Sequence, residues 1–152
     1  MIATPSTTAD LLTRYAHGLR DFSHWDLAEA DLRGAHLDGA DLRGAVLRGA
    51  DLRGAHLSGA ILAGTDLSNA NLTDASLDNA VLPYAILRNA NLTDASLVSA
   101  DLTGAVLHRA TLMRTDLVWA CLARADLTAV YWEDADVACA DMTGVVLNDD
   151  TL

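Results

Sequence analysis

Two histidines and one aspartate are the first residues whose types and spacing suggest chemistry. His36 and His56 lie 20 residues apart, and Asp38 follows His36 by two positions. Imidazole and carboxylate groups are common zinc ligands, but a zinc site needs three or four of them converging on one point. Here two histidines and one carboxylate stand on an outward, convex face, which does not favour convergence. We therefore expect a solvated ladder here, with no metal or other cofactor.

Serine, histidine and aspartate all occur in the chain, but nucleophilic catalysis also needs a pocket that orients them and excludes water. From Gly34 onward the glycines stand singly, at intervals that are multiples of five, and none belongs to a phosphate-binding loop ending in Gly-Lys-Ser/Thr. We expect no catalytic residues and no enzymatic activity.

The composition narrows the class of protein further. Hydrophobic residues make up 51% of the 152 residues, most of them alanine or leucine, which argues against disorder. No apolar run approaches the ~18 residues of a membrane span. We therefore expect no membrane partner. The net charge of -11 would repel nucleic acid, so we expect no nucleic acid partner and favour a basic protein partner.

A period of five residues runs through most of the chain. Every fifth position from Phe22 to Leu152 is apolar, and 23 of these 27 positions are leucine. Two residues before each of them the side chain is usually alanine, and the residue between is often Asp or Asn. Neither a helix nor a straight strand keeps a period of five on one face. The chain must therefore bend once per five residues, always the same way, with Leu and Ala inside.

The outward residues indicate four bends per coil. Residues 71–77 recur as 91–97, and residues 31–36 recur as 51–56, both at a spacing of 20. Residues 21–152 then make about 6.6 coils of 20 residues, with a rise of ~4.8 Å per coil.

The corners carry turn residues. Gly or Asn often ends each five, as expected where the third position of a type II turn needs positive φ. Pro83 falls at the second position, where its fixed φ fits. Arg109, Arg114, Trp119 and Arg124 stand at later corners, where we expect a different turn type.

Runs such as Ala40-Asp41-Leu42-Arg43-Gly44 and Ala90-Asn91-Leu92-Thr93-Asp94 resemble the pentapeptide-repeat family, whose pattern is Ala-(Asp/Asn)-Leu-X-X. The resemblance covers residues 21–152. It implies an all-β fold, a right-handed quadrilateral parallel β-helix. Some members of the family resemble DNA in shape and charge and bind DNA gyrase and topoisomerase IV, while many others have no assigned activity.

The two ends differ from the repeats. Within residues 1–20 we predict a tail and a short helix over 7–18, with Thr7 as N-cap, Asp10 in a capping box and Gly18 at the end, which covers the first coil. At the other end, apolar interior positions have no cap. We expect them to pair in a homodimer, as similar family members do, and the candidate dimer end comprises Trp132, Val137, Met142, Leu147 and Leu152.

Negative charge increases along the chain. Residues 109–152 carry eight acids and three arginines, for a net charge of -5, and no arginine follows Arg124. The candidate acidic interaction surface therefore comprises Glu133, Asp134, Asp136, Asp141, Asp149 and Asp150.

These features predict a non-enzymatic interaction or scaffold module with an undefined protein partner. The alternative is a DNA mimic that binds a basic DNA-binding protein such as gyrase or topoisomerase IV. Residues 1–8 show neither the basic nor the apolar region of a signal peptide, and two cysteines do not form a disulfide framework, so we expect a cytoplasmic location.

Overall fold

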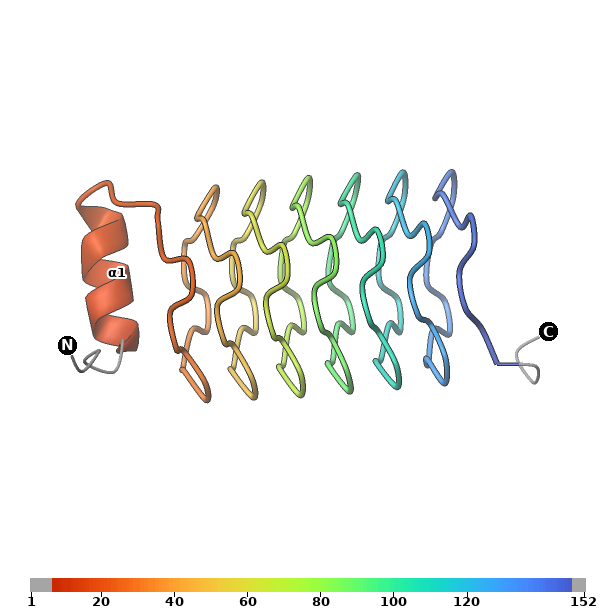
Figure 1. Ribbon diagram of the computed structural model, residues 1–152, viewed down its shortest axis with the longest axis horizontal. Coiled ribbons are helices and arrows are strands. Elements are labelled where there is room, and N and C mark those ends of the chain that lie inside the picture. The colour runs from red at the N-terminus through yellow and green to blue at the C-terminus, as the bar shows by residue number, and fades with distance from the viewer. Residues whose placement is uncertain (1–6, 149–152) are drawn as a thin grey trace.

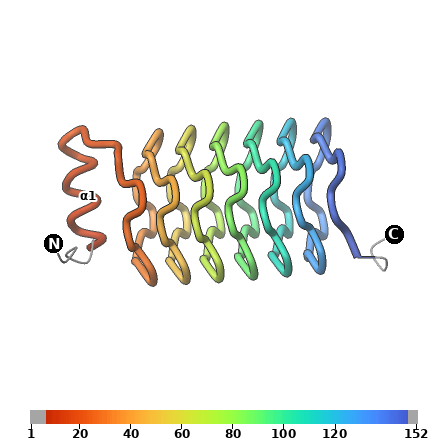
Figure 2. Tube along the Cα trace, viewed as in Figure 1, coloured from red at the N-terminus to blue at the C-terminus, as the bar shows by residue number. Residues whose placement is uncertain are grey.

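In the part of the chain that the structure describes, a long coil follows an N-terminal helix (Figure 1). The computed structural model describes residues 7–148. In that range the coil is held by isolated parallel bridges, without longer strands, and each bridge joins residues 20 apart, from Asp21 with Asp41 to Asp126 with Val146. Four pentapeptides therefore complete one coil, and residues 20 apart are neighbours on successive coils. Figure 2 shows these coils stacked in one continuous row.

Each bend is a hydrogen-bonded turn with one left-handed residue. The N–H of Ala35 donates to the carbonyl of Leu32 at 3.0 Å, and this contact recurs at successive corners. The residue just before the alanine has positive φ, 62° at Gly34 and 59° at Asn69. Positive φ at the third position alone is the signature of a type II turn.

The expectation of a different turn at the later corners is wrong. Arg109, Arg114, Trp119 and Arg124 have φ values of 59°, 54°, 62° and 62°, like the glycines. Hydrogen bonds on both sides fix this conformation: Arg109 N–H donates to Thr128 O at 3.0 Å, and Ala110 N–H closes the turn onto Leu107 O at 2.8 Å. This network imposes the left-handed conformation on a bulky residue, at a cost of ~1–2 kcal/mol.

The interior is a solid column of leucine and alanine. All leucines from Leu27 to Leu127 at the predicted interior positions are at most 2% exposed. Thr65 and Thr115 replace alanine and are fully buried, and their hydroxyls donate to Leu42 O and Leu92 O at 2.7 and 2.8 Å. Within the described part of the chain, no buried side-chain polar atom lacks a hydrogen-bond partner. The predicted inward set of Leu and Ala is confirmed.

Helix α1 spans Thr8–Ala16 and lies against the first coil (Figure 1). It is shorter than predicted, because His17 is the C-cap and Gly18 has φ of 90°. Thr7 is the N-cap and accepts a bond from Asp10 N–H at 3.1 Å, as predicted. The carboxylate of Asp10 pairs with Arg14 at 2.9 Å instead of reaching back to the backbone N–H of Thr7. Of the predicted capping box, the structure therefore shows only the bond from Asp10 N–H to the Thr7 side chain.

The contacts of α1 fix it to the end of the coil. Leu11 is fully buried, and the Tyr15 ring lies 6.5 Å from that of Phe22. The hydroxyl of Tyr15 donates to the backbone carbonyl of Asp38 at 2.8 Å. No helix within residues 7–148 has the length and apolarity that a membrane crossing requires.

Candidate functional site

The aspartates and asparagines before the leucines have a structural task. At 13 such positions, side-chain Oδ1 accepts a hydrogen bond from the backbone N–H two residues later, inside the turn. Asp101 accepts from Thr103 N–H at 2.9 Å, and Asn71 accepts from Thr73 N–H at 3.1 Å. An Asx side chain of this kind stabilises turns. Much of the acidic composition therefore belongs to the fold.

Arginines neutralise part of the charge on the N-terminal coils. Arg33 pairs with Asp31 at 2.7 Å and approaches Asp51 on the next coil at 3.8 Å, so opposite charges alternate on this side of the coil. Hydrogen bonds from the Arg33 side chain are the main cause that lowers the pKa of Asp31 to about 2. Arg43 and Arg53 likewise hold the pKa values of Asp41 and Asp51 below their usual range.

Negative charge concentrates on one side of the coil. This side comprises the ladder from His36 to Asp136, the row of corners two residues before it and the positions two residues after it. Its single arginine within residues 21–148, Arg114, pairs with Asp94 at 2.6 Å. Seven aspartates against one arginine leave this side with a net charge of -6. The sides that contain the ladders of Asp21, Asp26 and Asp31, counted over the same three kinds of position, carry net charges of -3, 0 and -1. We call the side with the charge of -6 the acidic side and define it by Asp38, Asp74, Asp78, Asp94, Asp116, Asp134 and Asp136.

The acidic residues predicted near the C-terminus are distributed around the coil. Asp136 lies on the acidic side and Asp134 at its corner, while Tyr131 and Cys121 mark the ladders of Glu133 and Asp141. These four residues therefore form a belt around the last coil, and Asp149 and Asp150 lie outside the described residues. The net charge of consecutive chain segments does not reveal the acidic side, because its residues are spread along the whole coil. Summing charge by position within the 20-residue repeat would have found it.

The predicted dimer end is a partly exposed apolar surface. Val137 and Leu147 are 37% and 36% exposed, and Trp132 and Met142 are partly buried against the core. In the described residues, the N–H groups of Trp132, Val137 and Met142 donate to no backbone carbonyl, unlike the corresponding leucines of earlier coils. Leu152 lies outside the described residues.

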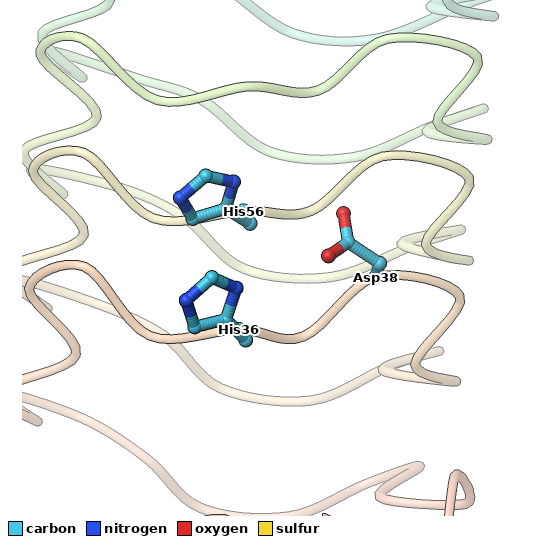
Figure 3. Close-up of side chains that lie close together, drawn as sticks. All are labelled: His36, Asp38 and His56. Carbon is cyan, nitrogen blue, oxygen red and sulfur yellow. The ribbon is translucent and has the colours of Figure 1, made fainter.

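Close to α1, the acidic side carries the histidine pair. His36 and His56 form a bridge, and their rings stack with centroids 4.4 Å apart and planes 13° from parallel, which confirms the predicted ladder. Asp38 lies beside them, and its carboxylate points toward the rings (Figure 3). One ligand atom from each residue lies within 4.8 Å of the others. The spacing groups these three residues, but the convergence of their ligand atoms was not predicted, because an outward, convex face was expected to carry only a solvated ladder.

A parallel β-helix of five-residue units defines the class of this protein. The sequence model for pentapeptide repeats matches eight copies, over residues 26–62, 60–97 and 90–128. The chain belongs to the pentapeptide-repeat family. Proteins of this family fold as right-handed β-helices and are generally non-catalytic structural or interaction modules, and no enzyme family is indicated.

Solved structures of other pentapeptide repeat proteins resemble this one. One is a protein of the Arabidopsis thaliana thylakoid lumen, with a TM-score of 0.66 and 35% identity over 68% of this chain and 72% of that chain. HetL from the cyanobacterium Nostoc sp. strain PCC 7120, involved in heterocyst differentiation regulation, has a TM-score of 0.62 and 26% identity over 97% of this chain and 99% of its own.

The fold also occurs in QnrB1, a plasmid-mediated fluoroquinolone resistance protein. A trypsin-treated variant of QnrB1 has a TM-score of 0.50 and 22% identity over 85% of this chain and 79% of that chain. At this identity the likeness concerns the fold alone. No curated protein sequence matches the chain.

Proposed function

We propose that this protein is a non-enzymatic interaction or scaffold module that binds a basic protein along its acidic side. The observation that carries the proposal is the net charge of -6 on one side, against -3, 0 and -1 elsewhere. Because the interior is filled by leucine and alanine, ligands have access to the outer surface only. Complementary charge increases the association rate and selects the partner.

In this proposal the four sides and the two ends of the coil are distinct surfaces that can bind different partners. Four bends per 20 residues give a quadrilateral cross-section, so each side presents its own row of side chains. Helix α1 serves as the N-terminal cap, because it covers Phe22 with Tyr15 and buries Leu11. We propose that Val137 and Leu147 at the opposite end, which are partly exposed, contact a second copy of the chain. We place the protein in the cytoplasm, as the sequence suggests.

The acidic side can be tested without disturbing the turns. Asparagine retains the oxygen that accepts the turn hydrogen bond, as Asn71 and Asn91 do, and it tolerates positive φ. The variant Asp74→Asn/Asp78→Asn/Asp116→Asn removes three charges from the acidic side. The control Asp21→Asn/Asp26→Asn/Asp101→Asn removes three charges from two other sides.

Affinity purification with the tagged full chain as bait compares these variants with the original protein. We expect partners to be lost with the acidic-side variant and retained with the control. A third variant, Asp134→Asn/Asp136→Asn/Asp141→Asn, tests the belt at the last coil. Equal recovery with all three variants would show that charge on these surfaces does not determine binding.

A second candidate function is mimicry of DNA toward gyrase or topoisomerase IV. The row of aspartates on a rod favours it, since a basic DNA-binding surface recognises regularly spaced negative charge. A gyrase supercoiling assay with and without quinolone separates the two functions. An effect that the acidic-side variant loses and the control retains supports mimicry, and no effect at micromolar protein excludes it for gyrase.

We also propose a homodimer through the C-terminal coil. Val137 and Leu147 expose apolar surface there, and the N–H groups of Trp132, Val137 and Met142 have no carbonyl partner in the described chain. A second copy related by a two-fold axis would cover this surface with its own identical one. Unpaired edge groups of this kind readily accept another chain.

A further inference from the structure

The stacked histidines beside Asp38 have free ligand atoms. Hydrogen bonds to protein occupy Nδ1 of His17, near Thr13 O at 2.7 Å, and Nδ1 of His108, near Thr128 Oγ1 at 2.6 Å. Among the described residues, the structure shows no such bond to the rings of His36 and His56, and both side chains are exposed. Their nitrogens are therefore available to a ligand from solvent.

Asp38 is held in place by the fold. Its Oδ1 accepts a hydrogen bond from Ser58 N–H at 3.0 Å, on the next coil. That N–H has no turn partner of its own, because residue 56 is histidine where half of the turns have Asp or Asn. The second carboxylate oxygen has no hydrogen bond within residues 7–148. A hydrogen-bonded carboxylate that keeps one free oxygen is a pre-oriented metal ligand.

Two imidazoles and one carboxylate suit a first-row divalent metal. We propose that His36, Asp38 and His56 bind one such ion, Zn²⁺ in particular, with water completing the coordination. Mg²⁺ and Ca²⁺ are hard cations that prefer oxygen ligands throughout, so they fit this set poorly. The net charge of -6 on the acidic side raises the local concentration of cations.

Binding requires a small movement of the side chains. Zn²⁺ holds nitrogen and oxygen ligands at about 2.0–2.2 Å, so tetrahedral ligands lie about 3.4 Å from one another. The three ligand atoms start within 4.8 Å. Nitrogen lone pairs lie in the ring plane, so the two nearly parallel rings must rotate apart to aim at one point. Exposed side chains rotate freely on the nanosecond timescale.

The site joins two coils at the end that α1 covers. His36 and Asp38 come from one coil and His56 from the next, and Asp38 O also accepts the bond from Tyr15. A metal ion bound here cross-links these coils beside the helix contact. Because the ion binds the folded chain only, it also stabilises the fold by mass action.

Calorimetric titration of the untagged full chain with ZnCl2 tests this site. We expect saturable binding of one Zn²⁺ per chain, a higher Tm with Zn²⁺ and no comparable binding of Mg²⁺. His36→Ala and His56→Ala each remove one of three ligands, so the affinity should fall by at least about tenfold. Asp38→Asn retains the acceptor for Ser58 N–H but loses the charge, so it should weaken binding while leaving the metal-free Tm unchanged.

Two control variants complete the experiment. His24→Asn removes a histidine at a corner where φ is 59°, which asparagine tolerates, and Cys139→Ser removes an exposed thiol that competes for zinc. Both should bind Zn²⁺ like the original chain. Absence of saturable binding, equal binding of Mg²⁺, or unchanged affinity in both histidine-to-alanine variants would each overturn the proposed site.

Discussion

Single side chains in this coil often serve the backbone before they serve the surface. Asp101 and Asp116 stand outward, yet each accepts a hydrogen bond from the backbone N–H two residues later. Asp38 does the same for the neighbouring coil, through Ser58. An outward aspartate is thus no sign of function by itself. Its position relative to other charges carries the functional information.

The paired carboxylates predict how stability responds to acid. Side-chain hydrogen bonds from arginine are the main cause that lowers the pKa values of Asp31, Asp41, Asp51 and Asp94, that of Asp31 to about 2. A pKa below the unfolded value of about 3.9 means that these groups stabilise the fold above that pH. This contribution is lost as the pH falls through the folded values.

Thermal unfolding followed by circular dichroism should therefore show a decrease in Tm between about pH 4 and about pH 2. Arg114→Gln removes the partner of Asp94 and should reduce the decrease, because the pKa of Asp94 then returns toward its unfolded value. Arg109→Gln is the control, since the structure gives Arg109 no ion pair within residues 7–148. A Tm that stays constant down to pH 2 would contradict this account.

Among the elements, the five-residue turn could be predicted from the sequence, because Leu32 and Ala35 have identically placed equivalents in coil after coil. The conformation at Arg109 and Trp119 could not, since local preference disfavours positive φ there and only hydrogen bonds to the neighbouring coil impose it. The predicted C-terminal boundary of α1, at Gly18, was wrong. Gly18 marks where the chain turns, but the helix ends earlier, at Ala16. The acidic side could be predicted by summing charge by position in the 20-residue repeat, whereas the orientation of Asp38 depends on its hydrogen bond to Ser58 on the next coil.

Helix α1 should stabilise the first coil through its buried face. Leu11 is fully buried and Leu12 is 36% exposed, so two adjacent leucines offer a matched comparison. Leu11→Ala should lower the free energy of unfolding of the N-terminal region by about 2–5 kcal/mol, as for other buried leucines. Leu12→Ala should have much less effect.

Hydrogen exchange resolves the effect along the chain. With Leu11→Ala, exchange should accelerate in the amides near Phe22 and Trp25, whose rings pack edge-to-face at 5.2 Å. Because coils contact only their neighbours, amides near Leu127 should keep their protection. Equal acceleration in both leucine variants would show that α1 does not cover the coil as proposed.

At the scale of the whole molecule, the two ends of the rod differ in how their apolar interior is covered. At the N-terminal end Leu11 and Phe22 are fully buried, whereas Val137 and Leu147 on the last described coil remain exposed. A chain of 16.0 kDa that forms the proposed dimer should show about twice that mass by light scattering at micromolar concentration. Val137→Asp should shift the mass to that of one chain, because it places a charge in the apolar centre of the contact. Val81→Asp is a close control, since both valines are 37% exposed and Val81 lies in the middle of the coil. If the original chain has a mass near 16.0 kDa, or if Val137→Asp and Val81→Asp have the same mass, the C-terminal coil is not the dimer contact, and any interaction along the acidic side then involves a single rod.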